Sequence, residues 1–133
     1  MEKMIRRVAK LKISSNFHFT GFLIGDNVDR MFAMSDVYVM PSVSEPFGIS
    51  PLEAMRSNVP VVISKQSGVA EVLDHVMKVD FWDVDAMADA IYGLLHYESL
   101  NTMFTTLGTE EVNNLKWESA ARKIADIYES VIK

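Results

Sequence analysis

The 133 residues are enough for one domain with a hydrophobic core, and 49% hydrophobic with 23% charged residues is a composition typical of a globular protein. The absence of cysteine excludes disulfides, thiolate metal sites and a cysteine nucleophile, and it suits a reducing cytoplasm, where we expect the protein to reside. The net charge of −5 argues against a nucleic-acid partner, and no apolar run approaches the roughly 18 residues of a membrane span.

Residues 1–12 are the basic part of the chain. They carry five Lys or Arg and one Glu, a net charge of +4, and their apolar residues recur at helical spacing: Met4, Ile5, Val8 and Leu11. Such a helix can lie on an anionic membrane, which would make the membrane a peripheral partner. We favour the alternative of an ordinary helix that packs on the core, because membrane-seeking helices usually carry more apolar bulk.

The rest of the chain alternates short apolar segments with helical patterns. Strands are predicted at residues 17–22, 36–41, 59–64 and 76–79. Helices are predicted from about residue 27 to 35, and at 50–57, 68–74, 84–95, 99–115 and 117–132. Alternating strands and helices, with strands apolar on both faces, predict an α/β fold with a parallel sheet between helices and extra C-terminal helices.

The turn at residues 44–53 follows the strand at 36–41. Ser50, Pro51 and Glu53 fit the cap, first and third positions of a helix, so that Ser50 and Glu53 would form a capping box. This explanation of Glu53 needs no function. It does not explain Glu45, which precedes a proline outside the helix, or Gly48, which lies just ahead of it.

The chemistry of this turn suits a sugar joined to a diphosphate. In a parallel α/β sheet, ligands bind outside the carboxyl ends of the strands, and the turn lies at such an end. The N–H groups of Gly48 and Ile49 can point at an anion, assisted by the helix dipole. The carboxylates of Glu45 and Glu53 can accept hydrogen bonds from sugar hydroxyls. A nucleotide sugar needs both functions.

Residues 39–55 therefore invite comparison with a known signature. Glu45 and Glu53, separated by seven residues, lie in a segment that resembles the E-x7-E signature of the retaining glycosyltransferases of family 4, the group 1 family. Other segments resemble further motifs of that family in the same order. They are residues 19–22 ("FxG"), 36–39 ("aDvyv"), 59–62 ("xPVV"), 67–72 ("gGxxEvv") and the late helix with Trp117 and Tyr128.

The resemblance implies the GT-B fold, in which two Rossmann-like halves flank a cleft. Residues 1–133 would be one partial domain, the Rossmann-like C-terminal half that binds the nucleotide-sugar donor. The partner that is missing would be the N-terminal half, which binds the acceptor. Two strand–helix units that carry an Arg and a Lys also have no counterpart before residue 17, so we expect a fragment that is inactive alone.

The resemblance also implies roles for individual residues. Glu45 would be the catalytic residue and face the donor sugar, and Glu53 would bind the ribose hydroxyls. The other substrate-binding residues would be Phe47, Gly48, Ile49 and Ser50 at the diphosphate and sugar, and Leu23 near the base. No metal and no cofactor are expected, since the nucleotide-diphosphate sugar is a co-substrate.

The sequence departs from the family motifs in two ways, and an alternative function remains open. Asn58 and Ser67 stand where the family usually has glycine, and the family motif that normally follows Val72 is not clear. The alternative is a non-catalytic α/β binding or scaffold domain in which Glu53 is only a helix cap. We expect the three histidines to be surface or packing residues and not metal ligands. Trp82 and Tyr92 could serve an inter-domain surface, but we favour packing in the core.

Overall fold

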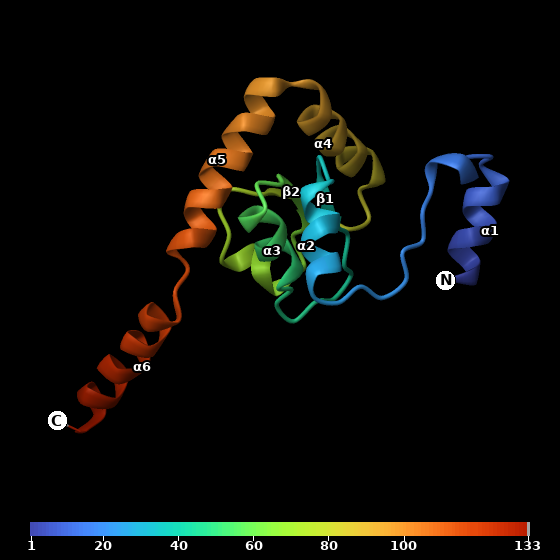
Figure 1. The fold of residues 1–133 in the computed structure, drawn as a ribbon. Coiled ribbons are helices and arrows are strands. Elements are labelled where there is room, and N and C mark those ends of the chain that lie inside the picture. The colour runs from blue at the N-terminus through green and yellow to red at the C-terminus, as the bar shows by residue number, and fades with distance from the viewer. Residues whose placement is uncertain (133) are drawn as a thin grey trace.

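The computed structural model describes residues 1–132 and has a parallel three-stranded sheet at its centre (Figure 1). The strands are β1 (Tyr38–Met40), β2 (Val61–Ser64) and β3 (Met77–Val79), in the order β1-β2-β3. Val39 lies opposite Val62, and Ile63 lies opposite Lys78. The α3 helix (Ser50–Arg56) connects β1 to β2, and a short 3-10 helix (Gly68–Glu71) lies between β2 and β3. The predicted α/β fold is confirmed.

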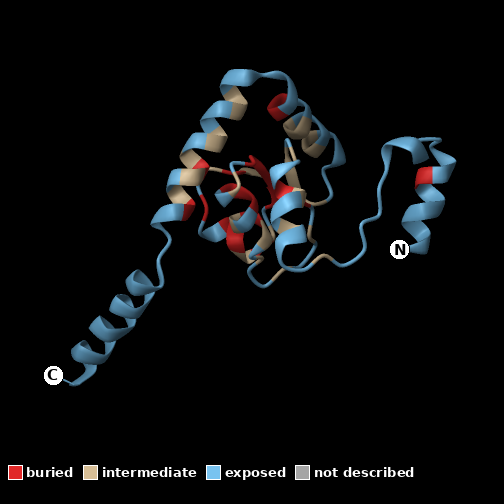
Figure 2. Cartoon of the chain, in the orientation of Figure 1, coloured by how far each residue is buried: buried red, intermediate tan, exposed pale blue. Residues whose placement is uncertain are grey.

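The core forms where α3 and the long α5 helix (Glu98–Asn114) pack beside the sheet (Figure 2). All four residues of β2 are buried, which explains their continuous apolar run. Ala54 and Met55 of α3 and Val112 of α5 belong to the same buried cluster. The α4 helix (Val84–His96) packs against α5 and against β2 and β3, and it buries Leu94.

The strand predicted at residues 17–22 does not form. The chain makes one 3-10 turn (Ser14–Asn16) and then runs without regular structure to α2 (Asp26–Ala33). Phe17 and Phe19 are each 42% exposed, and Phe22 is 93% exposed. A strand is stable only when another strand pairs with it, and β1 is an edge of the sheet with no strand beside it in the described residues.

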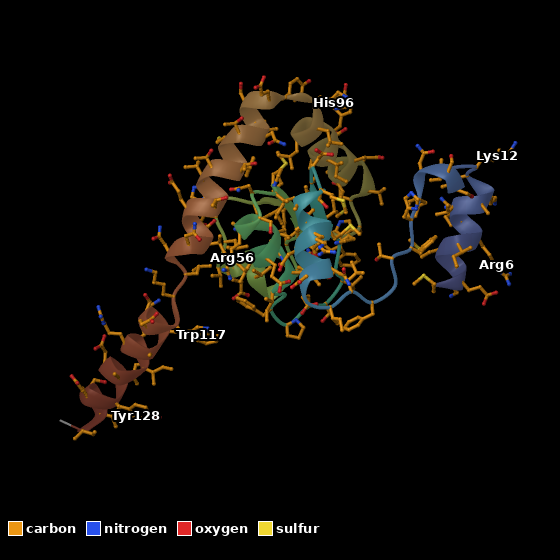
Figure 3. The ribbon with its side chains drawn as sticks, viewed as in Figure 1. Arg6, Lys12, Arg56, His96, Trp117 and Tyr128 are labelled. Carbon is orange, nitrogen blue, oxygen red and sulfur yellow. The ribbon has the colours of Figure 1, made fainter. Side chains whose placement is uncertain are left out.

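The two terminal helices project from the α/β body (Figure 1). The α1 helix (Glu2–Lys10) buries only Val8, so the prediction that it packs on the core is wrong. The α6 helix (Trp117–Ile132) is correctly predicted, yet it has no buried residue. Trp117 and Tyr128 project from α6, and they are 90% and 66% exposed (Figure 3).

Individual residues outside the core show further features of the fold. Asp83 caps α4, since its side chain accepts a hydrogen bond from the N–H of Ala86 at 2.9 Å. Trp82 and Tyr92 are 63% and 55% exposed, so their predicted core packing is wrong. Asn58 has a φ of +59°, which explains why glycine suits that position and why asparagine is tolerated. No helix in residues 1–132 combines the length and the apolar content needed to cross a bilayer.

Candidate functional site

The turn singled out in the sequence is a loop at the carboxyl end of β1. The site loop, residues 42–49, leaves the buried end of β1 at Met40 and enters α3 at Ser50. Glu45 makes an isolated parallel bridge to Ser67, which lies beyond the carboxyl end of the neighbouring strand β2. The loop therefore lies at the edge of the sheet where ligands of parallel α/β proteins bind.

The main chain of the site loop is held by the segment that follows β2. The Ser64 hydroxyl donates to the carbonyl of Ser42 at 2.5 Å. The N–H of Gly68 donates to the carbonyl of Glu45 at 2.9 Å, and the N–H of Val69 donates to the carbonyl of Phe47 at 2.8 Å. Three carbonyl groups of one loop are thus fixed by one neighbouring segment.

Gly48 turns the site loop into the helix. Its backbone φ angle is +90°, a conformation that residues with a Cβ rarely adopt. A Cβ at this position would lie 3.0 Å from Cε of Met40 and 3.1 Å from Cγ of Glu45. The absence of a side chain at Gly48 therefore lets the stem of Glu45 fold back over the start of the helix.

The predicted capping box is wrong. The residue that caps α3 is Ile49, whose carbonyl accepts from the N–H groups of Leu52 and Glu53 at 2.9 and 3.2 Å, and no side chain caps the helix. Ile49 already has helical φ and ψ values of −79° and −30°, because the turn at Gly48 starts the helix one residue earlier. Glu53 consequently lies one position beyond the reach of a capping box, and its exposed side chain does not serve as a cap.

Three consecutive amides precede this helix without a protein acceptor. Within the described chain, the N–H groups of Phe47, Gly48 and Ile49 donate no hydrogen bond. Ile49 is 65% exposed and Phe47 is 40% exposed, so this part of the loop lies at the surface. Backbone N–H groups in this arrangement are suited to an anion.

Tyr38 is a residue of this site that the sequence reasoning missed. Burial raises the pKa of its phenol above the ordinary value of 10.0, a hydrogen bond with the Ser50 hydroxyl lowers it, and the charges of Glu53 and Glu45 raise it. The phenol therefore lies among these three side chains. The signal in the sequence is the two-residue period of a strand, which puts Tyr38 on the same face as Met40.

Two open hollows border the site loop and the C-terminal end of α5. Their volumes are about 400 and 580 Å³, and both are lined by Phe47, Leu52, Leu115 and Trp117. The larger one also contains Glu53 and Arg56, and the smaller one contains Lys116 and Lys123. A carboxylate that can accept from hydroxyl groups and cations that can bind an anion thus border these two adjoining hollows.

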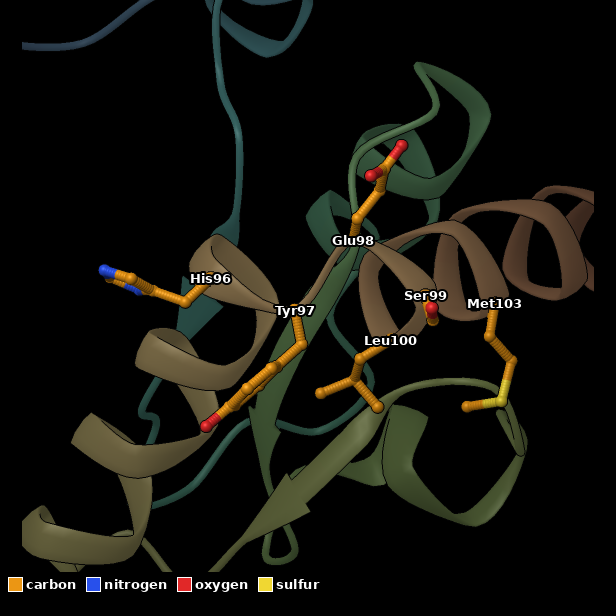
Figure 4. Close-up of a pocket in the computed structure, with 6 residues that line it drawn as sticks. All are labelled: His96, Tyr97, Glu98, Ser99, Leu100 and Met103. Carbon is orange, nitrogen blue, oxygen red and sulfur yellow. The ribbon is translucent and has the colours of Figure 1, made fainter.

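Another hollow, at the junction of α4 and α5, includes no residue of the site loop. It is lined by His96, Tyr97 and Glu98 together with Ser99, Leu100 and Met103 (Figure 4). Its imidazole is engaged elsewhere, since the His96 ring stacks on Tyr92 with 3.7 Å between ring centroids. We therefore assign the candidate site to the loop at β1.

The predicted contact of Leu23 with a base is not supported by the hollows beside the site loop. Leu23 is half-buried in the irregular segment before α2, and neither hollow that borders Phe47 includes it. Its place near a base stays a prediction. Among residues 1–132 no group of three or more His, Asp or Glu side chains could hold a metal ion. His75 instead lies 3.2 Å from a carboxylate oxygen of Glu111.

Comparison with known proteins identifies the family. The model of the family described as glycosyl transferases group 1 matches residues 1–111. The chain belongs to this family. It is 35% identical over 112 residues to a sulfoquinovosyl transferase of Arabidopsis thaliana, and 32% identical over 120 residues to an uncharacterised glycosyltransferase of Methanocaldococcus jannaschii. These alignments cover 80% and 83% of this chain.

Solved structures agree with this membership. The sucrose-phosphate synthase of Thermosynechococcus elongatus matches 98% of this chain with a TM-score of 0.81 and 25% identity. The C-terminal domain of a group 1 family glycosyl transferase from Francisella tularensis matches 84% with a TM-score of 0.75 and 23% identity. The fold of this group 1 chain is therefore that of the C-terminal domain of a GT-B glycosyltransferase, as the sequence predicts.

The group 1 chain is short beside its relatives. It spans 22% of the length of the Arabidopsis protein and 29% of that of the Methanocaldococcus protein. It also covers 34% of the sucrose-phosphate synthase chain. The similarity is thus to one part of larger proteins.

Proposed function

We propose that this chain is the part of a retaining glycosyltransferase that binds a nucleotide-sugar donor. The observation that carries the proposal is the site loop with the first turn of α3, where Glu45 and Glu53 flank in sequence the three free amides of Phe47, Gly48 and Ile49. In the complete enzyme, the sugar would pass to a hydroxyl group of a glycan, a lipid or another acceptor held by the missing N-terminal half.

Each group has a role in this reaction. The amides hold the diphosphate and the sugar hydroxyls, together with Ser50, and Glu53 accepts hydrogen bonds from the ribose hydroxyls. The bond between the anomeric carbon and the diphosphate oxygen breaks, and a bond to the acceptor oxygen forms on the same face of the sugar. The acceptor's proton passes to the departing diphosphate, while Glu45 stabilises the positive charge that develops on the sugar.

The charge of the diphosphate needs neutralisation, and we propose that no metal supplies it. Helix N-termini and basic side chains can stabilise a diphosphate. Arg56 borders the same hollow as Glu53 and is a candidate for this role. The two strand–helix units that the family carries ahead of this segment would supply further cations.

The first experiment is a titration of the backbone amide NMR signals with UDP, GDP and ADP, and then with their sugar conjugates. We expect shifts at Phe47, Gly48, Ile49 and Glu53 with one base preferred, while amides at the α4–α5 junction stay unchanged. Shifts spread evenly over the surface, with no preference among nucleotides, would contradict the proposal. If no nucleotide shifts any amide, the same titration on a longer chain with the preceding units decides whether those units are required.

The alternative is a non-catalytic α/β binding or scaffold domain built on the same fold. Such a domain would ignore nucleotides even with the preceding units restored. The free amides and the exposed Glu53 favour the donor-binding proposal, since a scaffold gives neither feature a role.

A further inference from the structure

We propose that Ser64 and Gly68 are positioning residues, which fix the main chain of the site loop and thereby set the place of Glu45. This inference rests on the catalytic role proposed for Glu45. Neither residue carries chemistry for glycosyl transfer, and both act through the loop that they hold.

Gly68 is required by contact and not by conformation. Its φ is outside the positive region that favours glycine, since the glycines in that region are Gly21, Gly25 and Gly48. A Cβ at Gly68, however, would lie 2.0 Å from the carbonyl oxygen of Pro46 and 2.8 Å from its carbonyl carbon. Any side chain there must push the main chain of the loop away, and it would break the hydrogen bond from the Gly68 N–H to Glu45.

Ser64 holds the other end of the loop. It is the last residue of β2 and is fully buried, and its hydroxyl donates a hydrogen bond to the carbonyl of Ser42 in the site loop. A buried hydroxyl at the end of an apolar strand is costly unless it is hydrogen-bonded. Ser67, also buried, donates to the carbonyl of Ser64 at 2.8 Å and closes the turn after the strand.

The segment that holds the loop is itself held to the end of β3. The N–H of Lys65 donates to the carbonyl of Val79 at 2.9 Å. The Gln66 side chain donates to Asp80 at 2.9 Å and accepts from the N–H of Phe81 at 3.2 Å. The position of Glu45 is thus fixed by the ends of all three strands, and a small displacement of a reacting group lowers turnover strongly.

The test compares Ser64→Ala and Gly68→Ala with two matched controls in the same chain. Gly93→Ala is a Gly-to-Ala change in α4, where the nearest atom to a new Cβ is Cδ2 of Leu100 at 3.3 Å. Ser35→Ala removes a hydroxyl that donates to the carbonyl of Met31 at 2.7 Å, on another element. The readout is amide hydrogen exchange of the whole chain, residue by residue.

Both site variants should raise exchange at the Gly68 and Val69 amides about tenfold or more, while β2 stays protected, because only the loop opens. The controls should leave these two amides unchanged. Unchanged protection in both Ser64→Ala and Gly68→Ala would overturn the inference. If every amide of the Gly68→Ala variant exchanges rapidly, that variant is unfolded. The result for Ser64→Ala then decides whether the inference holds.

Kinetics of the complete polypeptide give a readout that a purely structural role would not move. We expect kcat to fall by about tenfold to a hundredfold in Gly68→Ala, while the KM for the donor changes much less. An unchanged kcat would overturn the inference. Failure of the proposed function looks different, because the parent protein then binds no nucleotide although the exchange experiment still reports whether the loop is held.

Discussion

Glu111 on α5 holds His75 just before β3, since its Oε2 accepts from the His75 N–H at 2.9 Å and lies 3.2 Å from Nδ1 of the ring. Its Oε1 accepts from the N–H of Asp74 at 2.7 Å. We predict that Glu111→Gln lowers the free energy of unfolding by about 1–3 kcal/mol, because the amide turns an NH₂ group toward one of the two donors. Urea unfolding measures the loss, and the exposed neighbour variant Glu110→Gln should leave the midpoint unchanged. Equal midpoints for both variants would show that this link does not stabilise the fold.

Gly48 should tolerate alanine poorly. We expect Gly48→Ala to lower the free energy of unfolding by about 1–3 kcal/mol, from strain at φ +90° and from the contact with Met40. Gly25→Ala is the control for strain alone, because Gly25 has a φ of +57° and a new Cβ there meets nothing within 4 Å. Thermal unfolding should show the larger loss for Gly48→Ala. The reverse order would mean that the contact with Met40 is easily relieved.

Glu53 does not cap its helix, and this can be measured. Glu53→Ala should change the free energy of unfolding by less than about 0.5 kcal/mol, as expected for an exposed side chain without a cap contact. Asp83→Ala removes an observed cap of α4 and should cost about 1 kcal/mol. Chemical unfolding of the two variants side by side checks both values. A cost for Glu53→Ala as large as that for Asp83→Ala would restore the capping explanation.

Glu45 in the site loop and Glu53 in α3 should differ in their effects on kinetics, if they have the roles proposed for them. In the complete enzyme, Glu53→Ala should raise the KM for the donor, because it removes acceptors for the ribose hydroxyls. Glu45→Ala should lower kcat by about a hundredfold or more, because it removes charge stabilisation at the transition state. Steady-state rates over a range of donor concentrations separate the two effects. Unaltered kinetics in both variants would refute the assigned roles.

Tyr38 should make the stability of the protein depend on alkaline pH. Its phenol has a raised pKa in the fold, chiefly because it is buried, so the unfolded chain loses this proton at lower pH than the folded chain does. The stabilisation is complete below the unfolded value of about 10 and is lost as the pH rises through the folded pKa. Unfolding experiments from pH 8 to 11 should show a shallower decline for Tyr38→Phe than for the parent. Parallel declines would mean that the phenol ionises equally in both states.

The sequence predicts best where the local pattern and the tertiary structure agree. The segments at 36–41 and 59–64 are β-branched and apolar, and the shorter strands β1 and β2 lie inside them. The segment at 17–22 is also rich in strand-forming residues, but it forms no strand, because strand formation requires a paired neighbour. The helix predicted at residues 117–132 forms. Its apolar spacing, however, does not determine whether another surface covers it, and none of its residues is buried.

The candidate site is predictable in its location and less so in its geometry. The prolines, Gly48 and the two carboxylates mark the loop in the sequence, but the left-handed turn at Gly48 moves the helix start by one residue and removes the predicted capping box. Tyr38 and Gly68 could not be placed from the sequence. Their importance comes from neighbours that are 7 to 22 positions away in the chain.

The support of the site loop runs through main-chain carbonyl groups and not through its side chains. The carbonyl groups of Ser42, Glu45 and Phe47 are held by donors on a separate segment. Side chains such as Val43, which is 65% exposed, can therefore be exchanged without altering the path of the loop. If the donor-binding proposal holds, a library randomised at such positions, with residues 64–69 left intact, is the starting point for changing the donor that the loop binds.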